Sequence, residues 1–271
     1  MKFDAARVAD AIATVAAEEI VPRFRQLAAD DIREKKPGDL VTVADEAAER
    51  ALEARLRDIL PGSVVVGEEA VSKDAGILAR LDQAAPAWIV DPVDGTANFA
   101  AGLPLFAVMV SLAWGGQAVA AWIHDPLTGA MVSAERGAGA WLGDMRLRVA
   151  SAHDVASMSG AVSFRYGKRP LIRKIAGRTE RLGSVFQLRC AGQEYLALVR
   201  AQSHFSLYHR LMPWDHAAGQ LIHGEAGGYS ARLDGSSYRP SHLDGGLLLA
   251  PDQASWEAIH RVLVGRPDER V

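Results

Sequence analysis

The segment WIVDPVDGTANF, residues 88–99, restricts the fold and the chemistry of this chain more than any other segment. Its apolar start, residues 88–90, is typical of a buried strand. Asp91 and Asp94 follow directly, and Pro92 bends the chain between them. Two carboxylates with this spacing at a strand end can turn into one space and bind a hard cation through oxygen. The segment therefore predicts a metal site at the end of a strand.

The residues after Asp94 are suited to an anion. Gly95 permits a close backbone approach, and residues 96–99 can begin a helix whose free N–H groups would face a bound phosphate. The metal and phosphate sites would then adjoin. Taken alone, an Asp-Pro turn followed by Asp-Gly is also a common surface turn. The interpretation therefore needs further carboxylates.

Four more acidic residues are candidates for the same site. Glu68 and Glu69 follow a short apolar run, and Asp45 follows a strand-like run. Asp215 stands at the start of a predicted helix. Each has a structural alternative, since Asp45 and Asp215 are typical helix caps and Glu69 is a typical first-turn acid. Acidic ligands without histidine or thiolate favour Mg²⁺ over Zn²⁺.

Hydrophobic periodicity predicts an α+β N-terminal half followed by an α/β C-terminal half. The predicted strands are residues 40–43, 64–66, 88–90, 106–114, 118–124, 130–134, 161–164, 204–208 and 247–249. The predicted helices are residues 4–27, 44–60, 193–200, 214–225 and 255–263. The strands between residues 106 and 134 form an antiparallel meander in this interpretation, and residues 35–39 form a charged, turn-rich loop.

Composition and charge exclude several classes of protein. A net charge of -3 over 271 residues argues against a polyanion such as DNA as the main partner. No window approaches about 18 consecutive apolar residues, and the start lacks the apolar core of a secretory signal. We therefore expect a cytoplasmic protein that does not span a membrane. The single cysteine, Cys190, is interpreted as a buried structural thiol rather than a nucleophile, because no histidine lies near it in the sequence.

Several motifs together resemble those of a known family. They are Gly67-Glu68-Glu69, the segment from Asp91 to Phe99, and Trp214-Asp215-His216-Ala217-Ala218-Gly219, supported by residues 39–45 and 225–228. In this order and at these separations they are similar to the motifs of the inositol monophosphatases. The likeness covers nearly the whole chain.

The resemblance implies a layered αβαβα sugar-phosphatase fold, two or three bound Mg²⁺ ions, and hydrolysis of a small phosphate monoester by a metal-activated water. The implied metal ligands are Glu68, Asp91, Asp94, Asp215 and the backbone carbonyl of Val93. Thr96 and Asp45 would form a hydrogen-bonded pair that orients or deprotonates the water, with Glu68 as a further catalytic residue. The amides of Gly95 and Thr96 would hold the phosphate. Glu69 is expected beside the metal ligands rather than on the metal.

The implied substrate pocket departs from the family pattern. Tyr208 stands where true inositol monophosphatases have the acid that contacts the inositol ring. Gly192-Gln193-Glu194 replaces a segment that reads Gly-Thr-Ala or similar. Gly192 and Tyr208 are expected to bind substrate, and two bulkier polar residues would alter the pocket for the leaving group. The substrate is therefore open between inositol 1-phosphate, histidinol phosphate and other polyol phosphates.

The halves are expected to act together. Residues 1–150 would carry most metal ligands, and residues 151–271 would carry Asp215 and the leaving-group pocket. No linker separates them, so we expect one catalytic unit. The resemblance also implies a homodimer, for which the apolar residues 105–122 are a candidate interface.

Two alternatives stay open. A bisphosphate phosphatase, acting on 3'-phosphoadenosine 5'-phosphate or fructose 1,6-bisphosphate, would need basic residues near the pocket mouth. A basic run could supply them, namely Arg165, Lys168, Arg169, Arg173, Lys174, Arg178 and Arg181. Helical spacing favours a solvated face for this run over a nucleic-acid patch. The second alternative is a binding protein associated with transcription or RNA on the same fold.

The histidines do not predict a zinc site, because none has a compact metal-ligand spacing. We interpret them as surface or interface residues. His216 is an exception in one respect, since its place beside Asp215 would let it tune the site with pH.

Overall fold

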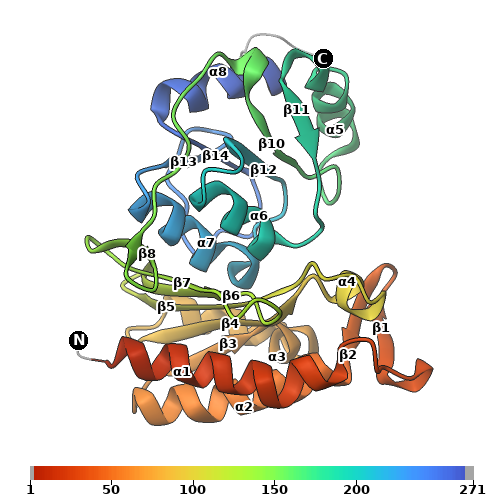
Figure 1. The fold of residues 1–271 in the computed structure, drawn as a ribbon, viewed down its shortest axis with the longest axis vertical. Helices are drawn as coiled ribbons and strands as arrows, with labels where there is room; N and C mark the ends of the chain where they lie inside the picture. The colour runs from red at the N-terminus through yellow and green to blue at the C-terminus, as the bar shows by residue number, and fades with distance from the viewer. Residues whose placement is uncertain (1–2, 266–271) are drawn as a thin grey trace.

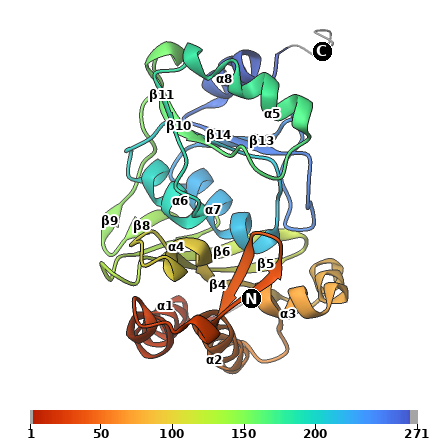
Figure 2. The ribbon, with the colours of Figure 1, turned by 90° about the vertical axis from the view of Figure 1, so that its right-hand side faces the viewer.

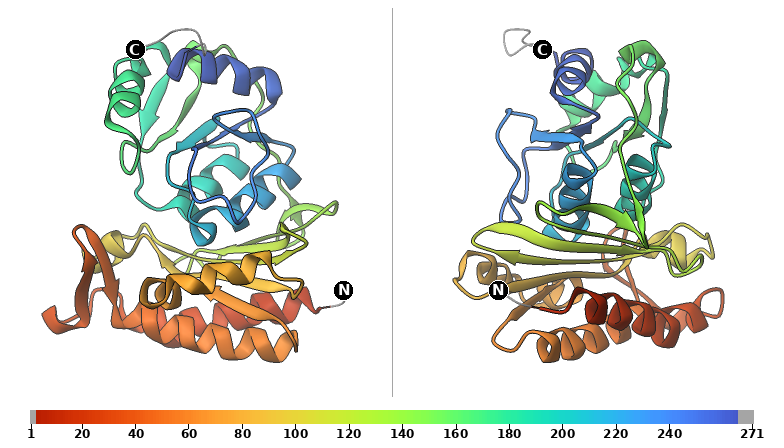
Figure 3. Two further views of the ribbon diagram at one scale, coloured as in Figure 1. Left: turned by 180° about the vertical axis from the view of Figure 1, so that it is seen from behind. Right: turned by 60° about the vertical axis from the view of Figure 1, so that its left-hand side comes forward.

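The computed structural model describes residues 3–265. Its helices and sheets alternate in five layers, with α1 and α2 at one end and α5 and α8 at the other (Figure 1). The layers are equally distinct from behind and from the side (Figure 3). The predicted αβαβα architecture is confirmed.

The first layer consists of two long helices that lie on one face of a sheet. Asp4 caps the first of them by accepting two backbone N–H groups of its first turn. The helix predicted over residues 4–27 is wrong in its length, since it passes through a π-helical and a 3₁₀ turn and ends near Pro22, whose ring nitrogen has no N–H. The bounds are α1 (Ala5–Val15), η1 (Ala16–Ile20), η2 (Val21–Arg23) and α2 (Val43–Ile59).

The second layer is a seven-stranded sheet in the order β3-β4-β5-β6-β7-β8-β9. Its strands are β3 (Val64–Gly67), β4 (Ala87–Asp94), β5 (Ala107–Trp114), β6 (Gln117–His124), β7 (Met131–Glu135), β8 (Gly139–Leu142) and β9 (Met145–Arg146). β3 is parallel to β4 and all later neighbours are antiparallel, so the predicted meander is confirmed. The register of β4 against β5 shifts between Asp91 and Asp94, because Pro92 cannot donate to the ladder.

The remaining layers belong to the C-terminal half. The five-stranded sheet has the order β11-β10-β12-β14-β13, in which β10 is parallel to both β11 and β12. Its strands are β10 (Ser159–Val162), β11 (Ser184–Phe186), β12 (Phe205–Tyr208), β13 (Tyr229–Arg232) and β14 (Leu247–Ala250). The helices are α6 (Ala191–Val199) and α7 (Pro213–Glu225) on one face, and α5 (Arg169–Ala176) and α8 (Gln253–Leu263) on the other. The sequence predicted α6, α7, α8, β10, β12 and β14, but not β11 or β13.

The remaining elements are short. They are the hairpin of β1 (Ile32–Lys36) and β2 (Asp39–Thr42), the helices α3 (Glu68–Lys73) and α4 (Thr96–Ala100), and the 3₁₀ turns η3 (Ala29–Asp31), η4 (Ala75–Asp82), η5 (Val155–Ser157) and η6 (Thr179–Arg181). The hairpin rises from the helix layer toward the C-terminal half (Figure 2). The loop predicted over residues 35–39 is therefore wrong at its start, because the charged residues 32–36 pair as a strand with β2.

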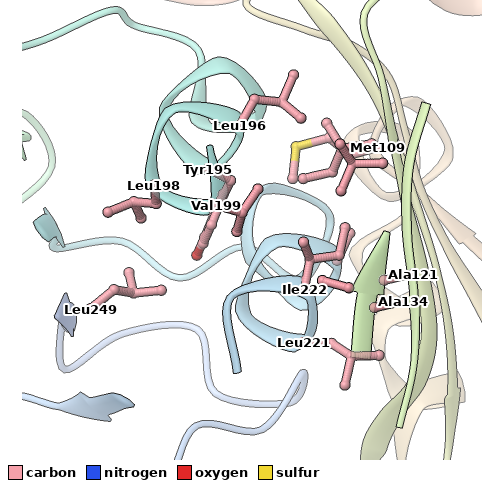
Figure 4. Packing of buried hydrophobic residues seen from close by; sticks show 14 of the residues in the cluster. Met109, Ala121, Ala134, Tyr195, Leu196, Leu198, Val199, Leu221, Ile222 and Leu249 are labelled. Carbon is pink, nitrogen blue, oxygen red and sulfur yellow. The ribbon is translucent and has the colours of Figure 1, made fainter. Parts of the chain in front are cut away.

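The halves share one hydrophobic core in the central layer. Side chains of the first sheet meet those of α6 and α7, among them Met109, Ala121, Leu196, Val199 and Ile222 (Figure 4). A second cluster fills the space between α1, α2 and the first sheet. A third lies between the second sheet and α5 and α8. The central cluster joins the two halves through apolar contacts rather than a linker.

The apolar strands of the meander are buried within this chain. All of β5 is buried except its last residue, because α2 and α7 cover the two faces of the sheet. Of residues 105–122, the large side chain left exposed is Trp114, at 49%. The faces of these strands are therefore covered within this chain, contrary to the suggestion from the sequence that they form a dimer interface. Of residues 105–122, the tip of the β5–β6 hairpin is the part that could still contact a second copy. None of the helices within residues 3–265 is long and apolar enough to cross a membrane.

Candidate active site

A cavity lies where the end of β4, α4 and the hairpin meet the loops of the C-terminal half. Carboxylates, backbone of the 93–97 segment and three arginines line it. The lining residues are Gly38, Asp39, Leu40, Glu68, Asp91, Val93, Asp94, Gly95, Thr96, Ala97, Ser163, Arg165, Tyr166, Gln187, Arg189, Cys190, Ala191, Glu194, Tyr208, His209, Arg210, Asp215 and His216. The four acids predicted as metal ligands are all on this wall.

The four carboxylates repel one another, with Asp91 and Asp94 buried and Glu68 and Asp215 half-buried. Burial raises the pKa of Asp91 well above its usual range, and the charge of Glu68 is the next cause. Burial also raises the pKa of Asp215 well above its usual range, and the charge of Glu68 is again the next cause. Burial raises the pKa of Asp94 to about 6. Acids collected in this way are stabilised by a cation among them.

Asp94 is held by the loop before α6. Its Oδ2 accepts the N–H of Gly192 at 2.5 Å and lies 3.0 Å from Cys190 Sγ. Burial raises the pKa of the Cys190 thiol well above its usual range, so the thiol keeps its proton and donates it to Asp94. The structural interpretation of Cys190 is therefore supported, with the added finding that it positions a site carboxylate.

Gly192 does not line the cavity. It lies behind Asp94, where a Cβ would come within 2.7 Å of the Ala107 Cβ and 3.2 Å of Asp94 Oδ2. The sequence-based expectation that Gly192 binds substrate is not borne out by this placement. Its neighbour Gln193 also points elsewhere, donating to the Phe106 carbonyl at 3.0 Å.

The turn after Asp94 needs glycine. Gly95 has φ 89°, and a Cβ there would lie 2.8 Å from the Leu105 carbonyl oxygen. α4 begins at Thr96 directly after it, as the sequence predicted. The N–H groups of Asn98 and Phe99 bond to the Gly95 carbonyl. The backbone from Gly95 to Ala97 remains on the cavity wall.

The predicted pair of Thr96 and Asp45 is present. Thr96 Oγ1 lies 3.0 Å from Asp45 Oδ1 and 3.0 Å from the Val93 carbonyl oxygen. Asp45 also accepts the N–H and hydroxyl of Thr42. Burial is the main cause that raises the pKa of Asp45 to about 6. Asp45 itself lies behind Thr96 and reaches the cavity through that hydroxyl.

Lys35 on β1 was not predicted as part of the site. Its Nζ lies 2.8 Å from Glu68 Oε1 and 3.0 Å from Glu69 Oε1, and the side chain is 12% exposed. The hairpin thus places one ammonium between two acids of α3. Glu69 is buried and faces Lys35 rather than the cavity, which agrees with a place beside the metal ligands.

Glu49 is a second residue that the sequence analysis missed. Its carboxylate accepts the N–H groups of Glu69 and Ala70, both at 2.7 Å, and so caps α3 from α2. A Cβ on Gly67 would clash with this carboxylate at 2.4 Å. The glycine of the Gly67-Glu68-Glu69 motif therefore exists to let Glu49 reach the helix start and fix Glu68.

The far wall of the cavity contains Tyr208, as predicted. Burial raises the pKa of its hydroxyl well above the usual range, and the neighbouring charge of Glu194 is the next cause. Glu194 Oε1 accepts the N–H of Leu188 at 2.9 Å. The sequence-based expectation of bulkier polar residues in this wall holds for Glu194, and not for Gln193.

His216 does not tune the site with pH in the way expected. It is buried, with Nδ1 3.2 Å from the Tyr195 hydroxyl and Nε2 2.9 Å from the Arg210 carbonyl. A carbonyl only accepts, so Nε2 carries a proton. Burial lowers the pKa of His216 to about 3. The expectation that the histidines lie at the surface or at an interface is also wrong for His124, His209 and His223, which are buried within the chain.

The donor set fits a hard divalent cation. It consists of carboxylates and the Val93 carbonyl, all oxygen, as Mg²⁺ prefers. Within residues 3–265, no group of three or more His, Cys, Asp or Glu side chains is already closed around a point that would hold an ion.

Comparisons with known proteins agree with this site. A family model described as "Inositol monophosphatase family" matches residues 4–266. The chain is 34% identical over 233 residues to the inositol-1-monophosphatase of Rhizobium meliloti, covering 84% of each chain. It is 31% identical over 236 residues to the Nus factor SuhB of Vibrio cholerae, covering 83% of each.

Solved structures share the fold. An inositol monophosphatase of Staphylococcus aureus superposes with a TM-score of 0.81 at 20% identity, covering 97% of this chain and 94% of that one. The Thermotoga maritima IMPase gives a TM-score of 0.78 at 23% identity, covering 94% and 96%. At such identities these structures show the fold alone.

Proposed function

This chain belongs to the inositol monophosphatase family, and from that premise we propose that it is a Mg²⁺-dependent phosphatase of a small phosphate monoester. One observation carries the proposal. Glu68 of α3, Asp91 and Asp94 of β4, and Asp215 of α7 line one cavity beside the backbone of Gly95. Their negative charges repel one another there, so a bound cation would stabilise all four.

Glu68, Asp91, Asp94, Asp215 and the Val93 carbonyl would hold two or three Mg²⁺ ions. Such ions lower the pKa of a water molecule and neutralise the transferred phosphate and the leaving oxygen. The chain's own part is to keep the carboxylates in place. Gly192 and Cys190 hold Asp94, and Glu49 holds the start of α3 with Glu68.

Thr96 and Asp45 would move a proton. The Thr96 hydroxyl is on the cavity wall and lies 3.0 Å from Asp45 Oδ1. Asp45 accepts the hydroxyl proton while Thr96 Oγ1 takes one from the attacking water. The pKa of Asp45, about 6, is suitable for a base near neutral pH, because a base acts best with a pKa near the working pH.

The backbone amides of Gly95 and Thr96 would bind the phosphate. The left-handed Gly95 brings the chain close to Leu105 and Cys190, and α4 begins at the next residue. Backbone N–H groups at a helix start attract anions. The transferred phosphate would then lie between these amides and the carboxylate wall.

The substrate would be inositol 1-phosphate, histidinol phosphate or a related polyol phosphate. A bisphosphate is the alternative substrate. The second alternative is a binding role in transcription or with RNA, which the name Nus factor SuhB of some relatives suggests. A binding role does not require a cavity lined with carboxylates, so we place hydrolysis first. A homodimer stays a prediction, and the tip of the β5–β6 hairpin, which carries the exposed Trp114, is a candidate contact surface.

The test is release of phosphate from these esters by the wild-type protein and by Asp94→Asn. We expect Mg²⁺-dependent release, and a loss of at least about 100-fold in kcat in the variant, because it removes a metal charge. Asp144→Asn is the matched control, since Asp144 is exposed in the turn between β8 and β9. Comparable turnover in both variants would sink the assignment.

A further inference from the structure

Three arginines line the cavity from the edge of the second sheet. β10, β11 and β12 are parallel, so their carboxyl ends lie at one edge. Arg165, Arg189 and Arg210 follow these strands in the next loops, and all three line the cavity. Loops at the carboxyl ends of parallel strands are where ligands bind. The arrangement brings together residues that are far apart in the sequence.

Two of these arginines have no acidic partner within the described part of the chain. Arg165 Nη2 lies 3.4 Å from the Gly38 carbonyl oxygen, across the mouth of the cavity from the hairpin turn. No ion pair joins Arg165 or Arg189 to a carboxylate of residues 3–265. Arg210 Nη2 lies 3.8 Å from Asp215 Oδ2, at the outer limit of an ion pair.

Tyr166 holds two of the guanidinium groups in place. The Cζ atoms of Arg210 and Arg165 lie 4.0 and 4.9 Å from the centre of its ring. Tyr166 has φ 63°, a left-handed conformation that is unfavourable for a non-glycine residue. The residue is 54% exposed and lines the cavity. Backbone strain at such a place is typical of a binding site.

We infer that Arg165, Arg189 and Arg210 bind a second anionic group, a carboxylate or a phosphate, on the alcohol part of the substrate. The inference rests on the proposed phosphatase activity and, among the substrates left open there, favours a doubly anionic ester over inositol 1-phosphate and histidinol phosphate. The transferred phosphate is already assigned to the backbone of Gly95 and Thr96 and to the cations that the carboxylates would hold, so the guanidinium groups are available for a second anion. The arginines come from the loops that would surround the alcohol. Guanidinium groups bind carboxylates and phosphates through paired hydrogen bonds.

The basic run from Arg165 to Arg181 contributes less than the sequence suggested. Arg165 alone among its seven cations lines the cavity. Arg173 on α5 is exposed elsewhere, and Arg178 Nη1 bonds the Val262 carbonyl at 3.4 Å. The second anion is therefore recognised by Arg165 with Arg189 and Arg210, rather than by the basic helix.

The experiment compares matched pairs of esters. Fructose 1,6-bisphosphate against fructose 1-phosphate tests a second phosphate, and 3-phosphoglycerate against glycerol 3-phosphate tests a carboxylate. We expect a higher kcat/KM for one doubly anionic member. In Arg189→Gln and Arg165→Gln this preference falls by about tenfold or more, mainly through KM. Arg173→Gln removes the same charge outside the cavity and leaves the preference intact.

The outcomes separate the inference from the proposed function. Mg²⁺-dependent release without preference for either doubly anionic ester, in wild type and variants alike, overturns the inference and leaves the phosphatase. If no ester is hydrolysed, the proposed function fails, and calorimetry on the Mg²⁺-loaded protein decides the inference alone. The inference is supported if the protein binds a doubly anionic ester more tightly than its singly anionic partner and Arg189→Gln loses this difference. Equal affinities for the two esters overturn it.

Discussion

At the scale of single residues, the site depends on side chains that orient other side chains. Cys190 and Gly192 fix one oxygen of Asp94, and Gly95 gives the chain a turn that a side chain would block. Groups that orient metal ligands commonly change metal affinity or activity by about 10–100-fold when replaced. Both features can be tested by small substitutions.

Cys190→Ala is expected to raise the Mg²⁺ concentration needed for half-maximal phosphate release about tenfold, because Asp94 loses a donor. Cys190→Ser should need nearly the wild-type Mg²⁺ concentration, since a hydroxyl also donates a hydrogen bond to Asp94. A thiol that only filled space would respond in the opposite order, with Ala tolerated better than Ser. Metal dependence of release in the three proteins distinguishes the two roles.

Gly95→Ala and Gly62→Ala separate backbone strain from collision. Gly62 has φ 84° and nothing within 4 Å of a built Cβ, whereas at Gly95 the Leu105 carbonyl oxygen is 2.8 Å away. We expect Gly62→Ala to reduce the free energy of unfolding by about 1 kcal/mol, and Gly95→Ala by clearly more. Equal losses in urea titrations would mean that the close approach at Gly95 is unimportant.

At the scale of elements, the acids were predictable where they follow apolar strands. β3 and β4 have continuous apolar runs that stop at Glu68 and Asp91, so the pattern marked the site. β1 was not predicted, because IREKK has no apolar alternation and pairs only through its backbone. Lys35, carried by that strand, was missed with it.

The cap of α3 was also invisible in the sequence. Glu49 lies mid-helix in α2 and reaches α3 only because the two elements pack side by side. Arg189 and Arg210 were missed for a similar reason, since a parallel sheet brings their loops together from separate segments. Periodicity describes one element at a time and does not report which loops meet.

Glu49→Ala is expected to lower the free energy of unfolding by about 1–2 kcal/mol, because two backbone N–H groups at the start of α3 lose their acceptor. Glu53→Ala on the same helix is the control, since Glu53 forms a surface ion pair with Arg57 at 2.7 Å and its loss should cost less than about 0.5 kcal/mol. Denaturant titration measures both. Equal values would contradict a capping role for Glu49.

At the scale of the whole molecule, two layered halves share a core and enclose the site between them. α7 belongs to the second half, yet it packs on strands of the first sheet and brings Asp215 to the acids of β4. The layer order followed from the family resemblance in the motifs. The central core did not, because it depends on which helix faces meet.

His223, in the middle of this core, gives a test of pH dependence. It is fully buried, its ring nitrogens have no hydrogen-bond partner within residues 3–265, and burial lowers its pKa to about 3. The unfolded chain binds this proton near pH 6.5 and the folded chain does not. The folded state is therefore disfavoured as pH falls from about 6.5 toward 3.

We expect wild type to lose about 1.4 kcal/mol of stability relative to His223→Leu between pH 7.5 and 5.5. Comparing two proteins cancels the titration of the site acids, which is common to both. Urea unfolding at the two pH values measures the difference. A constant difference would mean that His223 is protonated in the folded state or reaches water.

The most direct test of the account is phosphate release from inositol 1-phosphate and the other monoesters as Mg²⁺ is withdrawn with a chelator and then restored. We predict that release of at least one ester stops without Mg²⁺ and returns with it, because the carboxylates of both halves need the cation to bind and activate the ester. Release that continues unchanged in the chelator, or no release although Mg²⁺ binds, would contradict the account.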